Sequence, residues 1–161
     1  MTAFYFDVGG VLIPDKLSPD KARDVFRELG GRYGFSPEVA HITYTKLQPS
    51  LDLGETSMAE LCSALGIEQT SFERDWLAMH PLDGEVICTV ERLLGREHSV
   101  GLATNFCRHL LDLLVANTSV LSRLVVCCSS DIGLAKPSTE FFIVRVRSWV
   151  QVKSSSLMIA A

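Results

Sequence analysis

Short runs of strand-forming residues alternate with longer amphipathic segments in this chain, and this alternation most constrains the fold. The strand-like runs occupy residues 2–6, 99–103, 123–128 and 157–159, and segments of helical spacing separate the last three of them. A parallel strand pair needs a long crossover between its members. The pattern therefore predicts an α/β fold, with a Rossmann-like parallel sheet and helices on both faces.

A long, mostly helical segment at residues 15–96 interrupts the alternation after the first strand. Its helices are expected to begin at capping or helix-favouring residues: Ser18, Ser36, Ser57, Thr70 or Ser71, and Glu85. Gly30 and Gly31 predict the end of the first of these helices. The sequence therefore predicts a helical cap at 15–96, inserted into a discontinuous core of residues 1–14 and 97–161.

Two further groups of residues carry structural expectations. A helix over 139–150 is predicted to direct Phe142 toward the core. In the cap, Phe72, Trp76 and Met79 recur at helical spacing, which favours cap core over a substrate site. The four histidines show no mutual spacing that suggests a site, and they are expected at the surface or at helix ends: His41, His80, His98 and His109.

Composition excludes several classes of protein. The 161 residues are 47% hydrophobic, with a formal net charge of −4 and no block of Lys and Arg, so neither nucleic acid nor a membrane is an expected partner. The five cysteines lack the spacing of a zinc site, and no signal peptide precedes the first strand, which predicts a cytoplasmic protein. The sequence does not define an oligomeric state.

Polar residues follow the predicted strands where each strand ends. Asp7 comes after the first strand, Thr104 and Asn105 after the second, and Lys136 follows the third across a short loop. The carboxyl ends of parallel strands meet at the edge where α/β proteins bind ligands, so these residues should converge on one crevice. A carboxylate can attack phosphorus, whereas a hydroxyl and an ammonium can bind phosphate oxygens. The pattern predicts a phosphate crevice with Asp7 as the nucleophile.

The remaining predicted site residues are expected to contact the substrate or to orient the loops of the crevice. Gly9 and Gly10 have no side chains, so their backbone can approach an anion closely, and both are predicted to contact the substrate. Asn105 is predicted either to contact the substrate or to orient the loop.

Three segments resemble motifs of the haloacid dehalogenase-like (HAD) hydrolase superfamily. FDVGGVL at residues 6–12 is similar to its first motif, LATN at 102–105 to its second, and GLAKPSTEFF at 133–142 to its third. LDLGETSMAEL at 51–61 is similar to cap sequence in the branch that has two glycines after the nucleophile. That branch includes sugar-phosphate phosphatases.

The resemblance implies a reaction. Asp7 would attack the phosphorus of a small phosphorylated metabolite, and water would hydrolyse the resulting aspartyl-phosphate. Thr104 and Lys136 would bind the transferring phosphoryl group. Mg²⁺ would be held by Asp7, the carbonyl oxygen of Gly9 and an acid of the fourth motif.

Two positions depart from the family pattern. Gly9 replaces an acid that protonates the leaving group, and Ala160 and Ala161 stand where the family has an acidic pair. Weak Mg²⁺ binding is therefore expected. The family core continues with a further helix and strand, so the C-terminal part of the core is expected to be missing. Two alternatives to a phosphatase stay open: a truncated or catalytically impaired pseudoenzyme, and a metal-free haloacid dehalogenase.

Overall fold

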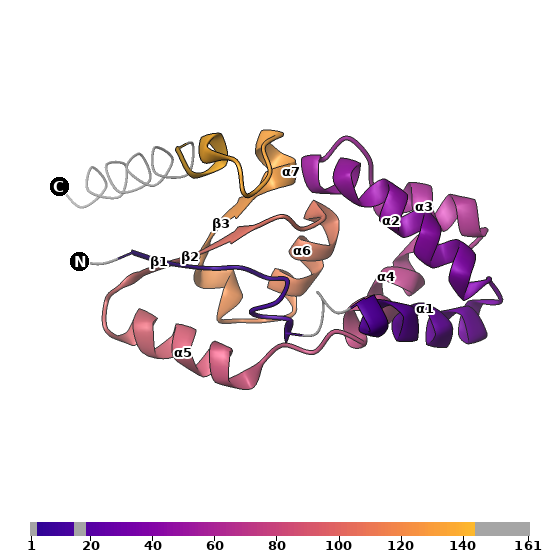
Figure 1. The fold of residues 1–161 in the computed structure, drawn as a ribbon. Coiled ribbons are helices and arrows are strands. Elements are labelled where there is room, and N and C mark those ends of the chain that lie inside the picture. Colours follow the sequence, from indigo (N-terminus) through magenta and orange to yellow (C-terminus); the bar gives the residue numbers. More distant parts are fainter. Residues whose placement is uncertain (1–2, 15–18, 144–161) are drawn as a thin grey trace.

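A three-stranded parallel sheet lies at the centre of the fold (Figure 1). The computed structural model describes residues 3–14 and 19–143. The strands are β1 (Ala3–Phe6), β2 (Ser99–Thr104) and β3 (Val125–Cys128), in the order β1-β2-β3. The predicted parallel sheet is confirmed over these strands, and the predicted fourth strand lies outside the described residues.

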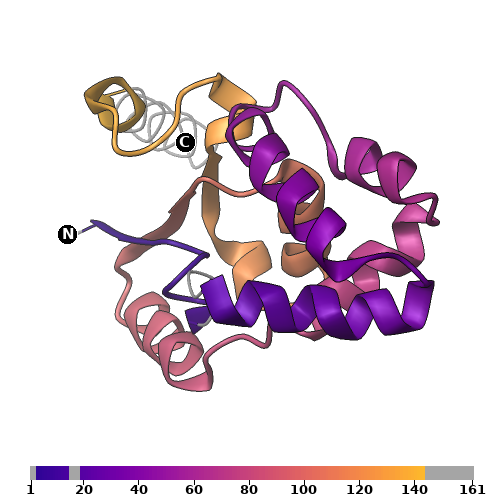
Figure 2. The same ribbon diagram turned by 45° about the vertical axis from the view of Figure 1, so that its right-hand side comes forward.

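Four helices form a group beyond the carboxyl ends of the strands (Figures 1 and 2). They are α1 (Pro19–Tyr33), α2 (Pro37–Leu53), α3 (Met58–Leu65) and α4 (Gln69–Ala78). We call α1–α4 the insertion. The predicted starts of α2 and α3 are confirmed, with Ser36 and Ser57 at the capping positions.

The other helices connect and cover the sheet, and with the strands they form what we call the core. They are α5 (Gly84–Gly95), α6 (Arg108–Ala116), the 3₁₀ helix η2 (Leu121–Arg123) and the short α7 (Ser129–Ile132). The predicted division of the chain at residues 96 and 97 stays a prediction. Within the predicted cap segment, α5 packs against β2 of the sheet.

The sheet is covered on both faces, as predicted. Leu102 faces the main hydrophobic core, to which α5 and α6 contribute, whereas Ala103 on the opposite face packs with Cys127 and Phe141. Residues 139–143 are helical in the described part of the chain. The prediction that Phe142 faces inward is wrong, because Phe141 fills the space beside Ala103 while Phe142 is 48% exposed.

Helix α1 continues through Gly30 and Gly31, so the prediction that it ends there is wrong. The last turn is held by tertiary packing, because the Tyr33 ring lies edge-on to the buried Phe72 ring at 5.9 Å. Gly30 also has a packing role, since a Cβ at this position would lie 2.8 Å from the carbonyl oxygen of Phe35. Tertiary contacts outweigh the low helix propensity of two glycines here.

Helix α4 begins slightly before the predicted Thr70 or Ser71. It starts at Gln69, because the Glu68 carboxylate accepts hydrogen bonds from the backbone N–H groups of Thr70 at 2.8 Å and Ser71 at 2.7 Å. These bonds lower the pKa of Glu68 to about 2. A carboxylate thus takes the capping role that the sequence pattern assigned to a hydroxyl.

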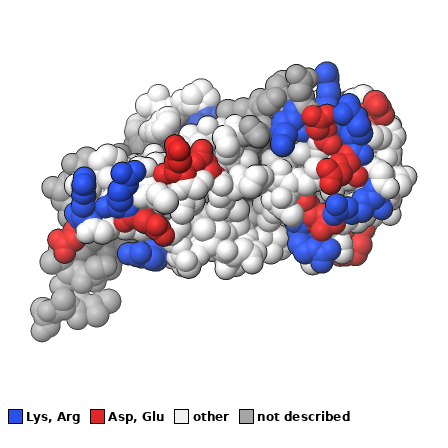
Figure 3. Space-filling model, turned by 90° about the horizontal axis from the view of Figure 1, so that it is seen from below, with Lys and Arg blue, Asp and Glu red and all other residues white. Residues whose placement is uncertain are grey.

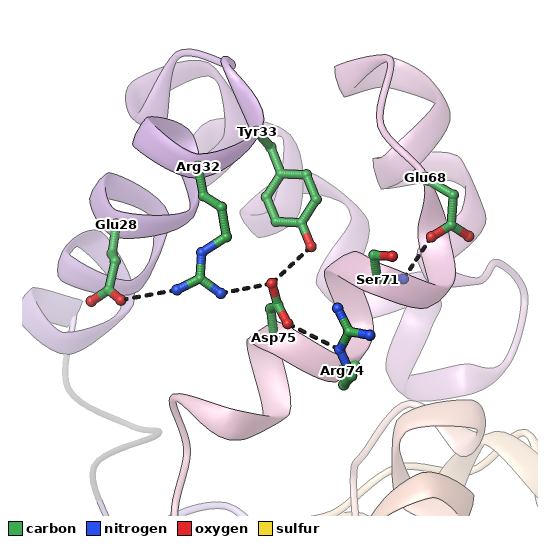
Figure 4. A network of polar contacts seen from close by, with 7 residues as sticks. All are labelled: Glu28, Arg32, Tyr33, Glu68, Ser71, Arg74 and Asp75. Carbon is green, nitrogen blue, oxygen red and sulfur yellow. Dashed lines mark hydrogen bonds and ion pairs between the residues drawn. The ribbon is translucent and has the colours of Figure 1, made fainter.

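Asp75 joins α4 to α1 through a cluster of polar contacts (Figure 4). Its carboxylate accepts hydrogen bonds from Arg32 Nη1 at 2.7 Å, Tyr33 Oη at 3.0 Å and Arg74 Nε at 3.1 Å. The bonds from Arg32 and Tyr33 are the main cause of its low pKa, about 2. Asp75 is therefore an acid-sensitive link within the insertion.

The lowered pKa predicts how Asp75 contributes to stability as pH changes. Its folded-state pKa of about 2 lies below the ordinary value of 3.8, so its stabilisation is complete above about pH 4 and is lost as pH falls through about 2. We expect Asp75→Asn to lower the melting temperature near neutral pH and to converge on the wild type near pH 2. Thermal unfolding over a pH series measures this. Asp24→Asn, which removes an exposed carboxylate paired with Arg27, is the control. A difference in melting temperature between Asp75→Asn and the wild type that does not change with pH would contradict the prediction.

The carboxyl end of α2 is attached to the core at α7. The hydroxyl of Ser129 donates a hydrogen bond to the main-chain carbonyl of Asp52. Gly54, which ends α2 with φ +74°, lies so close that a Cβ there would overlap the carbonyl oxygen of Ser130. Both features hold α2 against the core by its own backbone.

The charged side chains are mixed in sign on the face shown in Figure 3, where Lys and Arg lie among Asp and Glu at both ends. All five cysteines are free. In the segments that the structure describes, no helix combines the length and the apolar character needed to span a bilayer. The cytoplasmic location and the expected absence of nucleic-acid and membrane partners stay predictions.

Candidate active site

Asp7 lies directly after β1, at the edge of the sheet that faces the insertion. Its Oδ1 accepts a hydrogen bond from the N–H of Val8 at 2.8 Å, and its Oδ2 lies 2.5 Å from Lys136 Nζ. The loop that follows is anchored by the buried side chains of Leu12 and Ile13. The carboxylate is therefore held at a defined position and is paired with an ammonium group from the segment after β3.

The backbone of Lys136 is fixed by Asn105, which follows β2. Asn105 Nδ2 donates to the carbonyl oxygen of Lys136, and the N–H of Lys136 donates to Asn105 Oδ1, both at 2.9 Å. One amide thereby satisfies both main-chain polar groups of the residue whose ammonium contacts Asp7. Of the two predicted roles for Asn105, this contact supports the orientation of the loop.

The paired hydrogen bonds predict a stability cost for Asn105→Ala. The substitution leaves both main-chain groups of Lys136 without these partners, and we expect the free energy of unfolding to fall by about 1–3 kcal/mol. Urea denaturation measures the loss. Asn117→Ala is the matched control, because the side-chain amide of Asn117 donates an exposed hydrogen bond to the carbonyl oxygen of Leu113. Equal losses of unfolding free energy in the two variants would show that the contact with Lys136 stabilises the fold no more than an exposed hydrogen bond does.

A cleft of about 210 Å³ lies between the core and the insertion. The core side brings together four residues that the sequence predicted for the site: Asp7, Gly9, Asn105 and Lys136. The insertion, together with His80 just after α4, contributes a largely apolar and aromatic wall with a few polar groups: Ala22, Val25, Phe26, Tyr44, Gln48, Asp52, Trp76 and His80. The cleft therefore combines a charged floor with a wall suited to a small organic group.

Two predicted site residues do not line this cleft. Thr104 is fully buried at the end of β2, and its hydroxyl has no hydrogen-bond partner among the described residues. The N–H of Gly10 donates to the carbonyl oxygen of Ile13 at 2.9 Å, within the loop. Gly10 has a φ of +81°, a conformation that favours glycine, so its structural role in this turn is clear. The predicted roles of both residues in substrate binding stay predictions.

The sequence interpretation missed the contribution of the insertion to the cleft. His80, expected at the surface or at a helix end, is 5% exposed and follows the end of α4. Trp76 was predicted as cap core and is buried, but it also borders the cleft. Burial raises the pKa of Tyr44, with the charge of Asp52 acting in the same direction, so its hydroxyl stays protonated. No motif spacing marks these residues, because they converge only when the helices pack.

The donors near Asp7 agree in kind with those that Mg²⁺ takes. Mg²⁺ is usually bound by one or two carboxylates together with water and substrate phosphate. The Asp7 carboxylate and the main chain of Gly9 both border the cleft, and they supply oxygen donors of the right type. Within residues 3–14 and 19–143, no group of three or more His, Cys, Asp or Glu side chains is placed to hold a metal ion. Ala160 and Ala161 lie outside the described residues.

This arrangement defines the class of fold: a parallel α/β core with a helical insertion after the first strand and an aspartate at the end of that strand. Comparison with solved structures assigns it to the HAD-like fold, as the motifs predicted. The structure is similar to a HAD family enzyme from Bacteroides thetaiotaomicron, with a TM-score of 0.64 and 17% identity, over 88% of this chain and 75% of that chain.

A second similar structure is a dehalogenase, with a TM-score of 0.57 and 13% identity, over 92% of this chain and 70% of that chain. At these identities the likeness shows a shared fold. No protein-family model matches the sequence, and no curated protein matches it significantly. The resemblance to the sugar-phosphatase branch stays a prediction.

Proposed function

We propose that this protein hydrolyses the phosphate monoester of a small molecule, with Asp7 as the nucleophile. The observation that carries the proposal is the contact between Lys136 Nζ and Asp7 Oδ2, at 2.5 Å, on the floor of a cleft. A nucleophilic carboxylate beside an ammonium suits phosphoryl transfer, because the cation attracts the phosphate that the anion attacks. The cleft volume of about 210 Å³ supports a small substrate.

The residues would divide the reaction between them. Lys136 binds an oxygen of the phosphoryl group and offsets its charge, while Asn105 holds the backbone of Lys136 in place. Asp7 attacks phosphorus and forms an aspartyl-phosphate, which water then hydrolyses. Mg²⁺, held by Asp7 and the carbonyl oxygen of Gly9, would supply further positive charge next to the phosphoryl oxygens. The organic group of the substrate would contact the insertion.

Binding of inorganic phosphate to Lys136→Met tests this proposal. Loss of the ammonium leaves Asp7 to repel the anion, so we expect the affinity to fall about 10- to 100-fold. Isothermal titration calorimetry with and without Mg²⁺ measures the affinity. Lys46→Met, which removes an exposed lysine of α2 outside the cleft, is the matched control. Phosphate binding that is unaffected by Lys136→Met, or absent from the wild type, would overturn the proposal.

The calorimetry also bears on the pseudoenzyme alternative. A chain that binds inorganic phosphate through Lys136 and yet releases none from a wide panel of phosphate monoesters would be a binding protein that keeps the fold. The same panel shows whether Mg²⁺ is required. Measurable turnover would exclude this alternative.

A second candidate reaction is hydrolysis of a carbon–halogen bond. It is favoured by the similarity to a dehalogenase and by the aromatic wall formed by Phe26, Tyr44 and Trp76. An aspartate nucleophile serves this reaction equally well, because it can displace halide from carbon. Release of chloride from 2-chloropropionate, together with no release of phosphate from the monoester panel, would select this function.

A further inference from the structure

The proposed hydrolysis needs a proton donor, and residues 8–14, the part of the loop after Asp7 that the structure describes, carry no titratable side chain. The first step breaks a P–O bond and leaves negative charge on the departing oxygen. Gly9, which borders the cleft two residues after Asp7, has no side chain that could donate a proton. The donor therefore has to come from another group that reaches the substrate.

Five titratable groups line the cleft in the described part of the chain: Asp7, Tyr44, Asp52, His80 and Lys136. Asp7 and Lys136 are paired with each other, and in the proposed reaction they attack and bind the phosphoryl group. Burial raises the pKa of the Tyr44 hydroxyl, which makes it a poor proton donor to a leaving oxygen near neutral pH. An aspartate such as Asp52 is ordinarily already deprotonated there, whereas an ordinary imidazole both gives and accepts a proton near neutral pH.

His80 is held in one orientation in the wall of the cleft. Its ring is tilted by 32° from the Trp76 ring, with the centroids 4.0 Å apart, and its Nδ1 lies 2.7 Å from the carbonyl oxygen of Trp76. A carbonyl oxygen can only accept, so Nδ1 carries a proton in this contact. Nε2 is therefore the ring atom that gains and loses the exchangeable proton.

We infer that His80 is the general acid and base of this site, supplied by the segment after α4 in place of a side chain at Gly9. As Asp7 attacks phosphorus and the bond to the leaving oxygen breaks, imidazolium Nε2–H protonates that oxygen and the alcohol departs. Neutral Nε2 then takes a proton from water as the water oxygen attacks the aspartyl-phosphate. The bond between phosphorus and Asp7 breaks, phosphate leaves, and imidazolium is regenerated. This inference rests on the proposed phosphatase function.

His80→Asn tests the inference, because an Asn amide can still donate to the Trp76 carbonyl but does not titrate. Phosphate release is compared for glycerol 2-phosphate, whose alkoxide leaving group needs a proton, and p-nitrophenyl phosphate, whose leaving group does not. We expect kcat/KM to fall about 10²- to 10⁴-fold for the first substrate and less than about 10-fold for the second. The pH profile of the variant should also lack the ionisation that His80 contributes in the wild type. His98→Asn is the control outside the cleft.

The outcomes separate the inference from the proposed function. Equal losses on both substrates, or no loss on either, would overturn the role of His80 while leaving a phosphatase in place. A wild type that hydrolyses neither substrate would refute the phosphatase, and with it catalysis by His80.

A measurement without turnover tests the contact alone. Phenylphosphonate, a monoester analogue that is not hydrolysed, is titrated into ¹⁵N-labelled wild type, and the imidazole resonance of His80 is assigned through its nuclear Overhauser contacts with the Trp76 ring, whose centroid lies 4.0 Å away. We expect the Nε2 resonance of His80 to shift on binding, and that of His98 to stay in place. Binding without a shift at His80, or no binding, would overturn the inference even if His80→Asn fails to fold well enough for kinetics.

Discussion

Asp7→Asn is expected to abolish phosphate release, lowering kcat by a factor on the order of 10⁴ to 10⁶. The amide is nearly the same size as the carboxylate but has no charge with which to attack phosphorus, and it removes the partner that lies 2.5 Å from Lys136 Nζ. Single-turnover phosphate release measures the loss. Mass spectrometry after acid quench should detect a phosphorylated Asp7 in the wild type and none in the variant.

The control for Asp7→Asn is Asp112→Asn, which removes a half-exposed carboxylate of α6 paired with Arg108. It should leave turnover unchanged. Because the pair of Asp7 and Lys136 is partly exposed, its loss should change the free energy of unfolding by less than about 1 kcal/mol, so a loss of activity would not reflect unfolding. Turnover retained by Asp7→Asn would remove Asp7 from the reaction.

Phe72→Ala is expected to have the largest effect on stability, lowering the free energy of unfolding by about 3–5 kcal/mol. Phe72 is fully buried on α4, and the rings of Tyr33 and Phe35 lie edge-on to it at 5.9 Å and 6.1 Å. Truncation leaves a cavity where α1 and α4 meet, in the same continuous core that supports the cleft. Urea denaturation measures the loss.

Phe142→Ala is the matched control, because it removes the same side chain from a site that is 48% exposed. We expect it to cost less than about 1 kcal/mol. Similar losses for Phe72→Ala and Phe142→Ala would contradict the view that packing between α1 and α4 stabilises the insertion.

The core side of the site could be predicted from the sequence because it follows from the topology. Parallel strands bring their carboxyl ends to one edge of the sheet. Residues that directly follow the strands therefore lie close together, however many residues separate them in the sequence. Asp7, Asn105 and Lys136 converge in this way and border one cleft. The starts of α2 and α3 could also be predicted, because the residue preferences at a helix start depend on local geometry: Ser36 accepts a hydrogen bond from the N–H of Val39, and Ser57 occupies the capping position of α3.

The features that the sequence did not reveal depend on contacts between distant segments. His80 borders the cleft only because α4 packs where it does, and no spacing along the chain encodes that position. The helix α1 passes through Gly30 and Gly31 because Tyr33 packs on Phe72. Helical periodicity predicted Phe142 as the inward residue, whereas its neighbour Phe141 packs against the sheet. A shift of one residue in the helical pattern is enough to exchange the two rings.

The seam between α2 and α7 sets a limit on what this site can become. The main chain of α2 meets the core there, because the Asp52 carbonyl accepts a hydrogen bond from the Ser129 hydroxyl and Gly54 lies against the Ser130 carbonyl. Exchanging the side chains that α2 directs into the cleft would therefore alter the chemistry of the wall while these backbone contacts keep its distance from the floor. A larger residue in place of Gly54 would push α2 away from α7, because its Cβ would overlap the carbonyl oxygen of Ser130. The space open to a ligand therefore depends on how the backbone of α2 rests on the core.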